Sequence, residues 1–99
     1  MARYWISPKG KKLKCETHEL GATKIIKRKF RKEYIATRRY EIRNMPIEKH
    51  RASTRDDFLV YYKGYIKCDT DFRDYLNVGI ITKAQKEALF ELTGIWLDD

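Results

Sequence analysis

The sequence predicts a small α+β domain in which two or three helices pack on a small antiparallel sheet. The sheet is expected to consist of an N-terminal hairpin plus one or two further strands. Three observations support this: a strand–turn–strand pattern at the start, a helical stripe of apolar residues after it, and two later segments with capping residues at both ends. The expected order, β-β-α-(β?)-α-β-α, suits an α+β domain better than a helix bundle. A length of 99 residues corresponds to a single domain over 1–99.

The first fifteen residues have the pattern of a β-hairpin. Residues 3–7, RYWIS, are rich in strand formers, and residues 12–15, KLKC, alternate polar and apolar side chains. Pro8 and Gly10 lie between these segments, where a tight turn needs them. We therefore expect two paired strands at the N-terminus.

A basic, amphipathic helix is expected to follow the hairpin. Thr17 suits an N-cap, and Ala22, Ile26 and Phe30 recur with the i, i+4, i+8 spacing of one helical stripe. The helix should extend over about 18–32. Residues 34–43 contain Tyr34, Ile35, Thr37, Tyr40 and Ile42, and their β propensity favours a separate strand there, although Tyr34 and Thr37 also continue the helical stripe.

Two further helices are indicated by their caps. Thr54 with Asp57 three residues later opens a helix that Gly64 would end, and residues 65–68, YIKC, then read as a strand. Thr82 and Gln85 form a complete capping box for a last helix, which Gly94 would end. Residues 46–53 are predicted to be a loop, whereas the secondary structure of residues 69–76 is ambiguous. Residues 78–81 are expected to form a short strand or the lead-in to the last helix. The apolar residues 95–97 should pack back on the core.

The charge is distributed unevenly along the chain. The net charge of +8 divides into +12 over residues 1–55 and −4 over residues 56–99. No stretch is apolar enough to span a membrane, and the N-terminus lacks the apolar run of a signal peptide. Two cysteines are too few for a disulfide scaffold. These features predict a protein of the cytoplasm, inside a host cell.

The main functional pointer is the run from Lys24 to Arg43, which carries nine Lys or Arg residues and only two acids. Like charges this dense repel one another unless an anionic partner offsets them. Interleaved aromatic side chains could stack on unpaired bases. The sequence therefore predicts a non-enzymatic nucleic-acid-binding protein, for DNA or RNA, with no cofactor. The candidate binding residues are Lys24, Lys27, Arg28, Arg31, Lys32, Tyr34, Arg38, Arg39, Tyr40 and Arg43.

Metal binding and catalysis have weaker sequence support. Cys15, His18, His50 and Cys68 could in principle supply zinc ligands, but only the first pair has the expected close spacing. Asp69, Asp71 and Asp74 could hold Mg²⁺ if they converge. No nucleophile elbow or phosphate loop is present in the sequence. The prediction is no metal, no catalytic residue and no enzyme activity.

A membrane surface and a protein are the other partners that a basic surface could bind. An anionic membrane is not expected, because the apolar stripe of the basic helix is needed for the core. The alternative to nucleic acid is a protein partner: the chain would then be an inhibitor or adaptor that blocks a host factor, such as a defence ribonucleoprotein of the CRISPR type. In that case Arg and Tyr would serve as interface hot spots.

Four segments in a fixed order resemble small uncharacterised phage and prophage proteins. They are the WISPKGK hairpin at 5–11, THEL opening a helix at 17–20, the helix–glycine–strand DDFLVYYKGYIKC at 56–68 and the capped helix ITKAQKEALFEL at 81–92. The resemblance implies a viral or mobile-element context and supplies no catalytic residues. The basic segment from about 31 to 52 departs from that pattern, which suggests that the specific role of this chain lies there.

Overall fold

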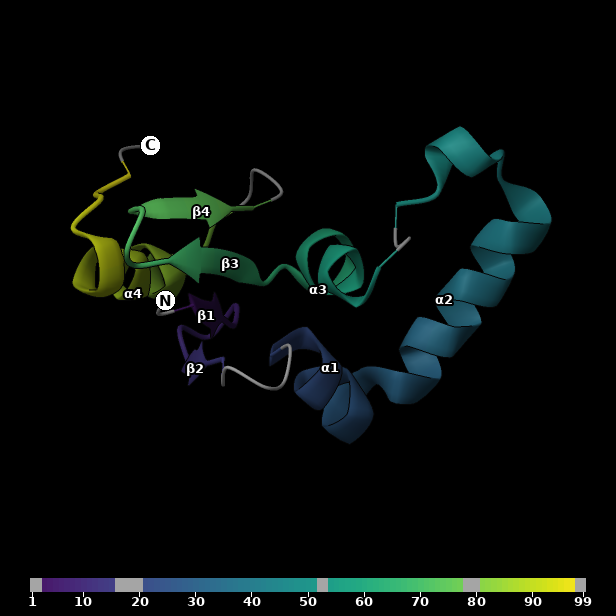
Figure 1. The fold of residues 1–99 in the computed structure, drawn as a ribbon, viewed down its shortest axis with the longest axis horizontal. Helices are drawn as coiled ribbons and strands as arrows, with labels where there is room; N and C mark the ends of the chain where they lie inside the picture. Colours follow the sequence, from purple (N-terminus) through teal and green to yellow (C-terminus); the bar gives the residue numbers. More distant parts are fainter. Residues whose placement is uncertain (1–2, 16–20, 52–53, 78–80, 98–99) are drawn as a thin grey trace.

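The structure is a computed structural model that describes residues 3–15, 21–51, 54–77 and 81–97. Within these residues four strands form one antiparallel sheet in the order β2-β1-β3-β4 (Figure 1). The strands are β1 (Arg3–Ile6), β2 (Lys12–Lys14), β3 (Ile66–Asp69) and β4 (Asp74–Leu76). The predicted α+β class, with the hairpin and two further strands, is confirmed.

The helical part consists of one long bent helix and two separate helices, α3 (Arg55–Lys63) and α4 (Lys83–Thr93). The bent helix runs through α1 (Gly21–Ile25), the π turn η1 (Ile26–Phe30) and α2 (Arg31–Asn44). A 3₁₀ turn, η2 (Ile47–Lys49), then leads back towards α3. In Figure 1 the bent helix and α3 lie on one side of the sheet, while α4 lies on the other. None of the helices described is long and apolar enough to cross a membrane.

The side chains of β1 alternate between the two faces of the sheet, and the core accordingly forms two clusters. Successive side chains of a strand point to opposite faces of the sheet, so Trp5 and Ile6 face opposite ways. Trp5 packs with Ala22, Ile26 and the buried residues of α3, whereas Ile6 packs with Ile66, Cys68 and the buried residues of α4. The sheet is therefore covered on one face by α1 and α3 and on the other by α4.

The predicted helix caps are confirmed. Thr54 accepts a hydrogen bond from the backbone N–H of Asp57, and Thr82 with Gln85 forms the complete capping box. Gly64 and Gly94 adopt left-handed conformations, with φ of 70° and 76°, at the ends of α3 and α4. Thr17 and residues 78–80 lie outside the described residues. The apolar segment 95–97 packs only in part, because Leu97 contacts the core but Trp96 remains 53% exposed beside Phe90.

The strand predicted over 34–43 is wrong, because these residues are helical within α2. The β propensity of Tyr34, Ile35 and Tyr40 is overridden by tertiary packing. The helical stripe continues to Tyr34, whose ring centroid lies 5.4 Å from that of Phe58 on α3. The predicted loop over 46–53 contains η2. The bent helix therefore extends the basic run along one continuous element.

Gln85 joins α4 to the rest of the core. Its side chain is buried, its Nε2 donates to the carbonyls of Gly64 (2.7 Å) and Ile6 (3.3 Å), and its Oε1 accepts from the N–H of Thr82. These bonds satisfy backbone groups at the end of β1 and at the end of α3. The buried glutamine therefore fixes α4 relative to both other layers.

We expect Gln85→Ala to lower the free energy of unfolding by about 1–3 kcal/mol, because it leaves carbonyl groups without donors inside the protein. Glu87→Ala, two residues later on an exposed position of α4, is the matched control and should change stability little. Urea denaturation followed by circular dichroism measures both. Equal midpoints for the two variants would contradict the structural role of Gln85.

Candidate nucleic-acid interface

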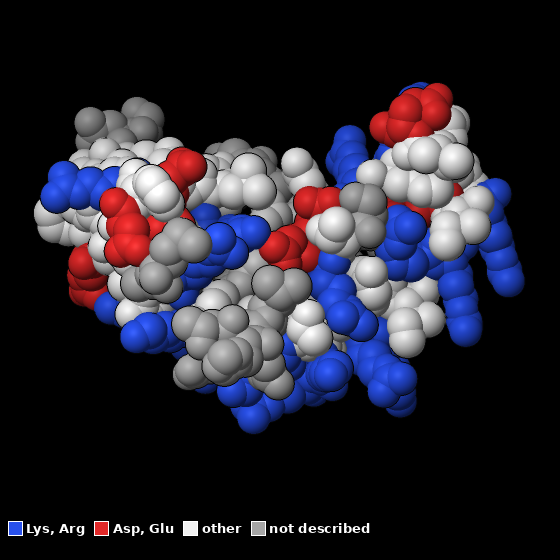
Figure 2. Space-filling model, viewed as in Figure 1, with Lys and Arg blue, Asp and Glu red and all other residues white. Residues whose placement is uncertain are grey.

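The outer surface of the bent helix carries a row of exposed cations. We call this surface the basic face, and its residues are Lys24, Lys27, Arg28, Lys29, Arg31, Lys32, Arg39 and Arg43. None of them makes an ion pair with another described residue. In Figure 2 the lower right margin of the molecule, over α1 and α2, is formed mainly by Lys and Arg. The helical spacing thus gathers most of the predicted binding residues on one side.

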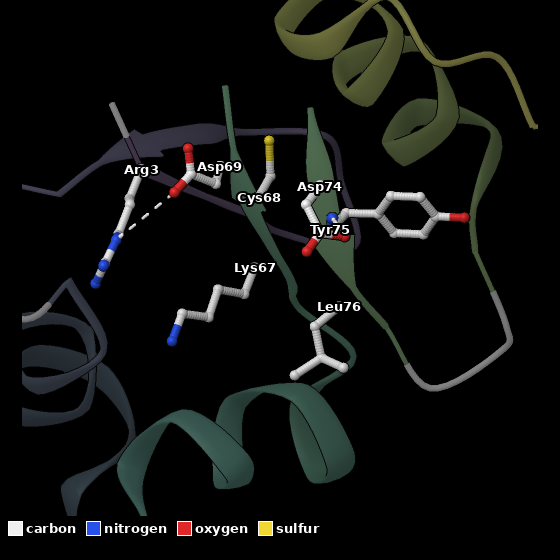
Figure 3. Close-up of a pocket in the computed structure, with 7 residues that line it drawn as sticks. All are labelled: Arg3, Lys67, Cys68, Asp69, Asp74, Tyr75 and Leu76. Carbon is white, nitrogen blue, oxygen red and sulfur yellow. Dashed lines mark hydrogen bonds and ion pairs between the residues drawn. The ribbon is translucent and has the colours of Figure 1, made fainter. Parts of the chain in front are cut away.

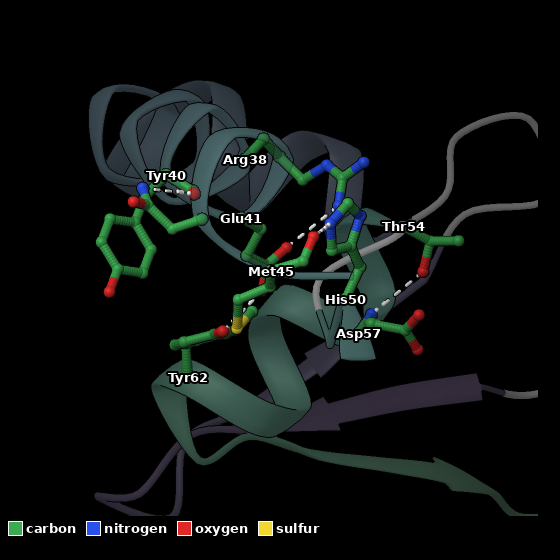
Figure 4. Close-up of polar contacts among 9 residues, drawn as sticks. Arg38, Tyr40, Glu41, Met45, His50, Thr54, Asp57 and Tyr62 are labelled. Atoms are coloured by element: carbon green, nitrogen blue, oxygen red, sulfur yellow. Dashed lines mark hydrogen bonds and ion pairs between the residues drawn. The ribbon is translucent and has the colours of Figure 1, made fainter. Parts of the chain in front are cut away.

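The two acids of the basic run both make contacts with residues of α3. The Glu33 carboxylate pairs with the ammonium group of Lys63 on α3. The Glu41 carboxylate is fully buried, accepting from the Tyr62 hydroxyl of α3 at 2.5 Å and from the Arg38 guanidinium at 3.0 Å (Figure 4). Both negative charges therefore serve to attach the bent helix to α3. Neither acid forms an ion pair with a cation of the basic face.

Two of the predicted binding residues make contacts within the fold. Arg38 is directed to the buried Glu41, and Tyr34 packs edge-on against Phe58. Both side chains are therefore engaged in contacts within the fold. Tyr40 differs from them, because it is 62% exposed and remains available on the surface.

The bend at the π turn keeps the helix in contact with α3. The backbone at Phe30 leaves the α-helical region, with φ −118° and ψ 12°. Its ring then packs edge-on against Phe58 and Tyr65, with centroid distances of 6.4 and 6.2 Å. The ammonium group of Lys63 lies 4.9 Å from the centre of the Phe30 ring, a cation–π contact. Such one-turn π segments recur at functional sites, and here the turn redirects the cations of α2 relative to those of α1.

A groove between the hairpin and the bent helix contains cations that the sequence prediction did not include. It has a volume of about 410 Å³ and is lined by Lys9, Lys11, Lys14, Lys24, Arg28 and Lys29, and none of the described residues that line it is acidic. A smaller hollow of about 220 Å³ shares Lys24 and Arg28 with it. The sequence contained one indication of these hairpin lysines. The net charge of residues 1–55 is +12, and the basic run accounts for only +7 of it. We call this feature the basic groove.

A second cavity, of about 310 Å³, lies against β3 and β4 and has mixed charge (Figure 3). Arg3 approaches Asp69 at 4.0 Å in it, and Lys67 binds Asp56 of α3 at 2.7 Å. Burial raises the pKa of the Cys68 thiol to about 11, so this side chain is a protonated thiol at neutral pH. The charges of this cavity are used within the fold.

The possible metal ligands have separate places in the structure. Cys15 packs against the Trp5 cluster, Cys68 belongs to the Ile6 cluster, and the His50 ring is hydrogen-bonded to the carbonyl of Met45 at 2.8 Å. His18 lies outside the described residues. Asp69 accepts from the N–H groups of Asp71 and Phe72 and so shapes the β3–β4 turn. Within the described ranges no three His, Cys, Asp or Glu side chains lie close enough to hold a metal.

Comparison of the chain with models of protein families, with curated proteins and with solved structures gives no significant match.

We expect Tyr62→Phe to lower the free energy of unfolding by about 1–3 kcal/mol, because a buried carboxylate then lacks one of its donors. Tyr61→Phe is the matched control, since Tyr61 is exposed and precedes it on α3. The hydrogen bond to Glu41 raises the pKa of Tyr62 above its ordinary value of 10.0. This stabilisation is therefore present below pH 10.0 and is lost as the pH rises through the raised pKa.

Chemical denaturation of both variants at neutral and at strongly alkaline pH tests this expectation. The stability difference between wild type and Tyr62→Phe should shrink at alkaline pH, while Tyr61→Phe should follow wild type throughout. A Tyr62→Phe variant as stable as the Tyr61→Phe variant would show that Glu41 does not need this donor.

Proposed function

We propose that the protein is a non-enzymatic nucleic-acid-binding protein that engages the phosphate backbone of DNA or RNA through the basic face. One observation carries the proposal: both acids of the basic run are paired with residues of α3, and the outward cations have no ion pair within the described part of the chain. If the basic face were only a solvated exterior, it would not benefit from having its cations unpaired, because repulsion between like charges destabilises a folded protein.

The dimensions of the basic face suit a polyanion. From Lys24 to Arg43 the helical path is about 28 Å long at 1.5 Å per residue. One DNA strand places a phosphate roughly every 3.4 Å along its axis, so several phosphates lie within reach. Each neutralised phosphate releases counterions, which makes binding strong at low salt and weak at high salt. Contacts of this kind give affinity with little sequence preference.

We expect Arg31→Glu combined with Lys32→Glu to weaken binding of a labelled oligonucleotide by about tenfold or more at roughly 50 mM salt. The affinity of the wild-type protein should fall steeply between about 50 and 200 mM salt, and the variant should show a shallower dependence on salt. Fluorescence anisotropy measures both quantities. Arg73→Glu, an exposed position in the β3–β4 turn away from the basic face, controls for the change of charge.

Salt-independent affinity, or the absence of DNA and RNA binding at low salt, would overturn the proposal. An Arg73→Glu variant that loses as much affinity per charge as the double variant would show that only the overall charge matters.

A protein partner is the second candidate, and exposed apolar side chains near the end of α2 favour it. Tyr40, Ile42 and Ile47 are 62%, 63% and 84% exposed, and they lie among cations on α2 and η2. An acidic protein groove could bind the cations while these side chains fill apolar pockets. A host ribonucleoprotein would offer protein and nucleic acid together.

The two candidates respond differently to nuclease. If a protein partner is engaged directly, co-purification of one defined host protein should survive nuclease treatment and should be lost in the Ile42→Ser, Ile47→Ser double variant. Co-purification that disappears with nuclease and is unchanged in this variant would leave nucleic acid as the partner.

A further inference from the structure

The basic groove differs from the basic face because it combines cations with an apolar interior. Leu13 and Ile25 are partly buried in the adjoining core cluster, and Tyr65, 4% exposed, forms part of the wall. The cations come from two elements, the hairpin on one side and the bent helix on the other. A ligand in this groove would therefore contact apolar groups in the middle and positive charge at both edges.

The hairpin edge of the groove is held in place by α4. The Thr82 hydroxyl donates to the carbonyl of Pro8 at 2.7 Å. Gly10 has φ +86° and lies so close to Ala84 that an added Cβ would come within 2.9 Å of the alanine side chain. Ser7 closes the turn, accepting from the N–H groups of Gly10 and Lys11. The turn that carries Lys9 and Lys11 is thus fixed before any ligand arrives, which reduces the entropy lost on binding.

The hairpin lysines also differ in how their charge is used. Lys12 pairs with Glu91 of α4, on the other side of the sheet. Lys9, Lys11 and Lys14 line the groove and make no ion pair with the described residues. Lys24, Arg28 and Lys29 belong both to the groove and to the basic face, so the two positive surfaces are continuous.

From these observations we infer that the groove receives an unpaired nucleotide, and that the preferred ligand is a single strand of nucleic acid. The inference rests on the proposed nucleic-acid function and specifies its substrate class. The base would lie against Leu13, Ile25 and Tyr65, and the flanking phosphates would meet the lysines of the hairpin and the cations of the bent helix.

The size and chemistry of the groove favour a single strand over a duplex. A volume of about 410 Å³ lies within the range of roughly 300–1,000 Å³ typical of small-ligand pockets. A base in a duplex must be unstacked and unpaired before it can enter, which costs a few kcal/mol, whereas a base in a single strand is already accessible. Because Tyr65 is almost fully buried, it acts as a wall and offers no open ring for stacking. Preference among the bases should accordingly be weak.

The test compares three labelled ligands of about 12 nucleotides, a length within common single-strand site sizes. They are an oligothymidine strand, an abasic strand with the same phosphates, and a duplex. The wild-type protein should bind oligothymidine about tenfold tighter than either other ligand, because base contacts in a groove add to the phosphate contacts. Purely electrostatic binding would favour the duplex, which has the higher charge density.

Two double variants with the same change of charge locate the effect. Lys9→Glu with Lys11→Glu changes only the hairpin edge of the groove, and it should lower oligothymidine binding about tenfold while duplex binding falls much less. Arg39→Glu with Arg43→Glu changes the basic face outside the groove and should weaken single strand and duplex alike. Circular dichroism melting confirms that each variant is folded.

The outcomes separate the inference from the function on which it rests. Equal binding of oligothymidine and the abasic strand, a tighter duplex, or equal losses for both ligands in the hairpin variant would overturn the groove as a base site and leave the basic face as a phosphate-binding surface. No binding of any of the three ligands at low salt would overturn the nucleic-acid function itself.

Discussion

The position of α2 depends on the carboxylate of Glu41. Half of the residues of this helix are charged, and Glu41 is its only buried residue among those described. A buried charge is costly unless it is paired and hydrogen-bonded, and here the Tyr62 hydroxyl and the Arg38 guanidinium supply the partners. Such a pair adds less stability than an apolar contact would, but it specifies one orientation of the helix. With Glu41 turned to α3, the opposite side of α2 faces solvent, and that side carries Arg39 and Arg43.

The same constraint separates the charges of the molecule. Glu33 and Glu41 hold the bent helix to α3, Asp56 pairs with Lys67, and Glu91 pairs with Lys12. These acids lie between elements or on α4, where they stabilise the fold. Most of the described cations that make no ion pair lie along α1, η1 and α2 or line the basic groove. An asymmetric field of this kind attracts polyanions and speeds their association.

The sequence predicted those parts of the fold that have local causes. The hairpin turn, the caps at Thr54 and Thr82, and the glycine stops at Gly64 and Gly94 each depend on residues only a few positions apart. The conformation of 34–43 was mispredicted because it depends on a distant contact: Tyr34 and Glu41 face α3, about twenty residues later in the chain. Helical periodicity predicted the basic face only as far as Lys32, because Arg39 and Arg43 were assigned to the strand that proved to be helical. The groove was not predictable, because its hairpin and helix edges meet only in the folded protein.

A backbone-amide NMR titration of the full chain with a short single strand at low salt tests the central claim most directly, since it reports which surface is engaged. We expect the largest shifts in residues 9–14 of the hairpin and along residues 24–43 of the bent helix, with small shifts in α4 and β4. Shifts concentrated on α4 or β4, or spread evenly over the molecule, would contradict this expectation, because binding would then not depend on the basic face and the basic groove.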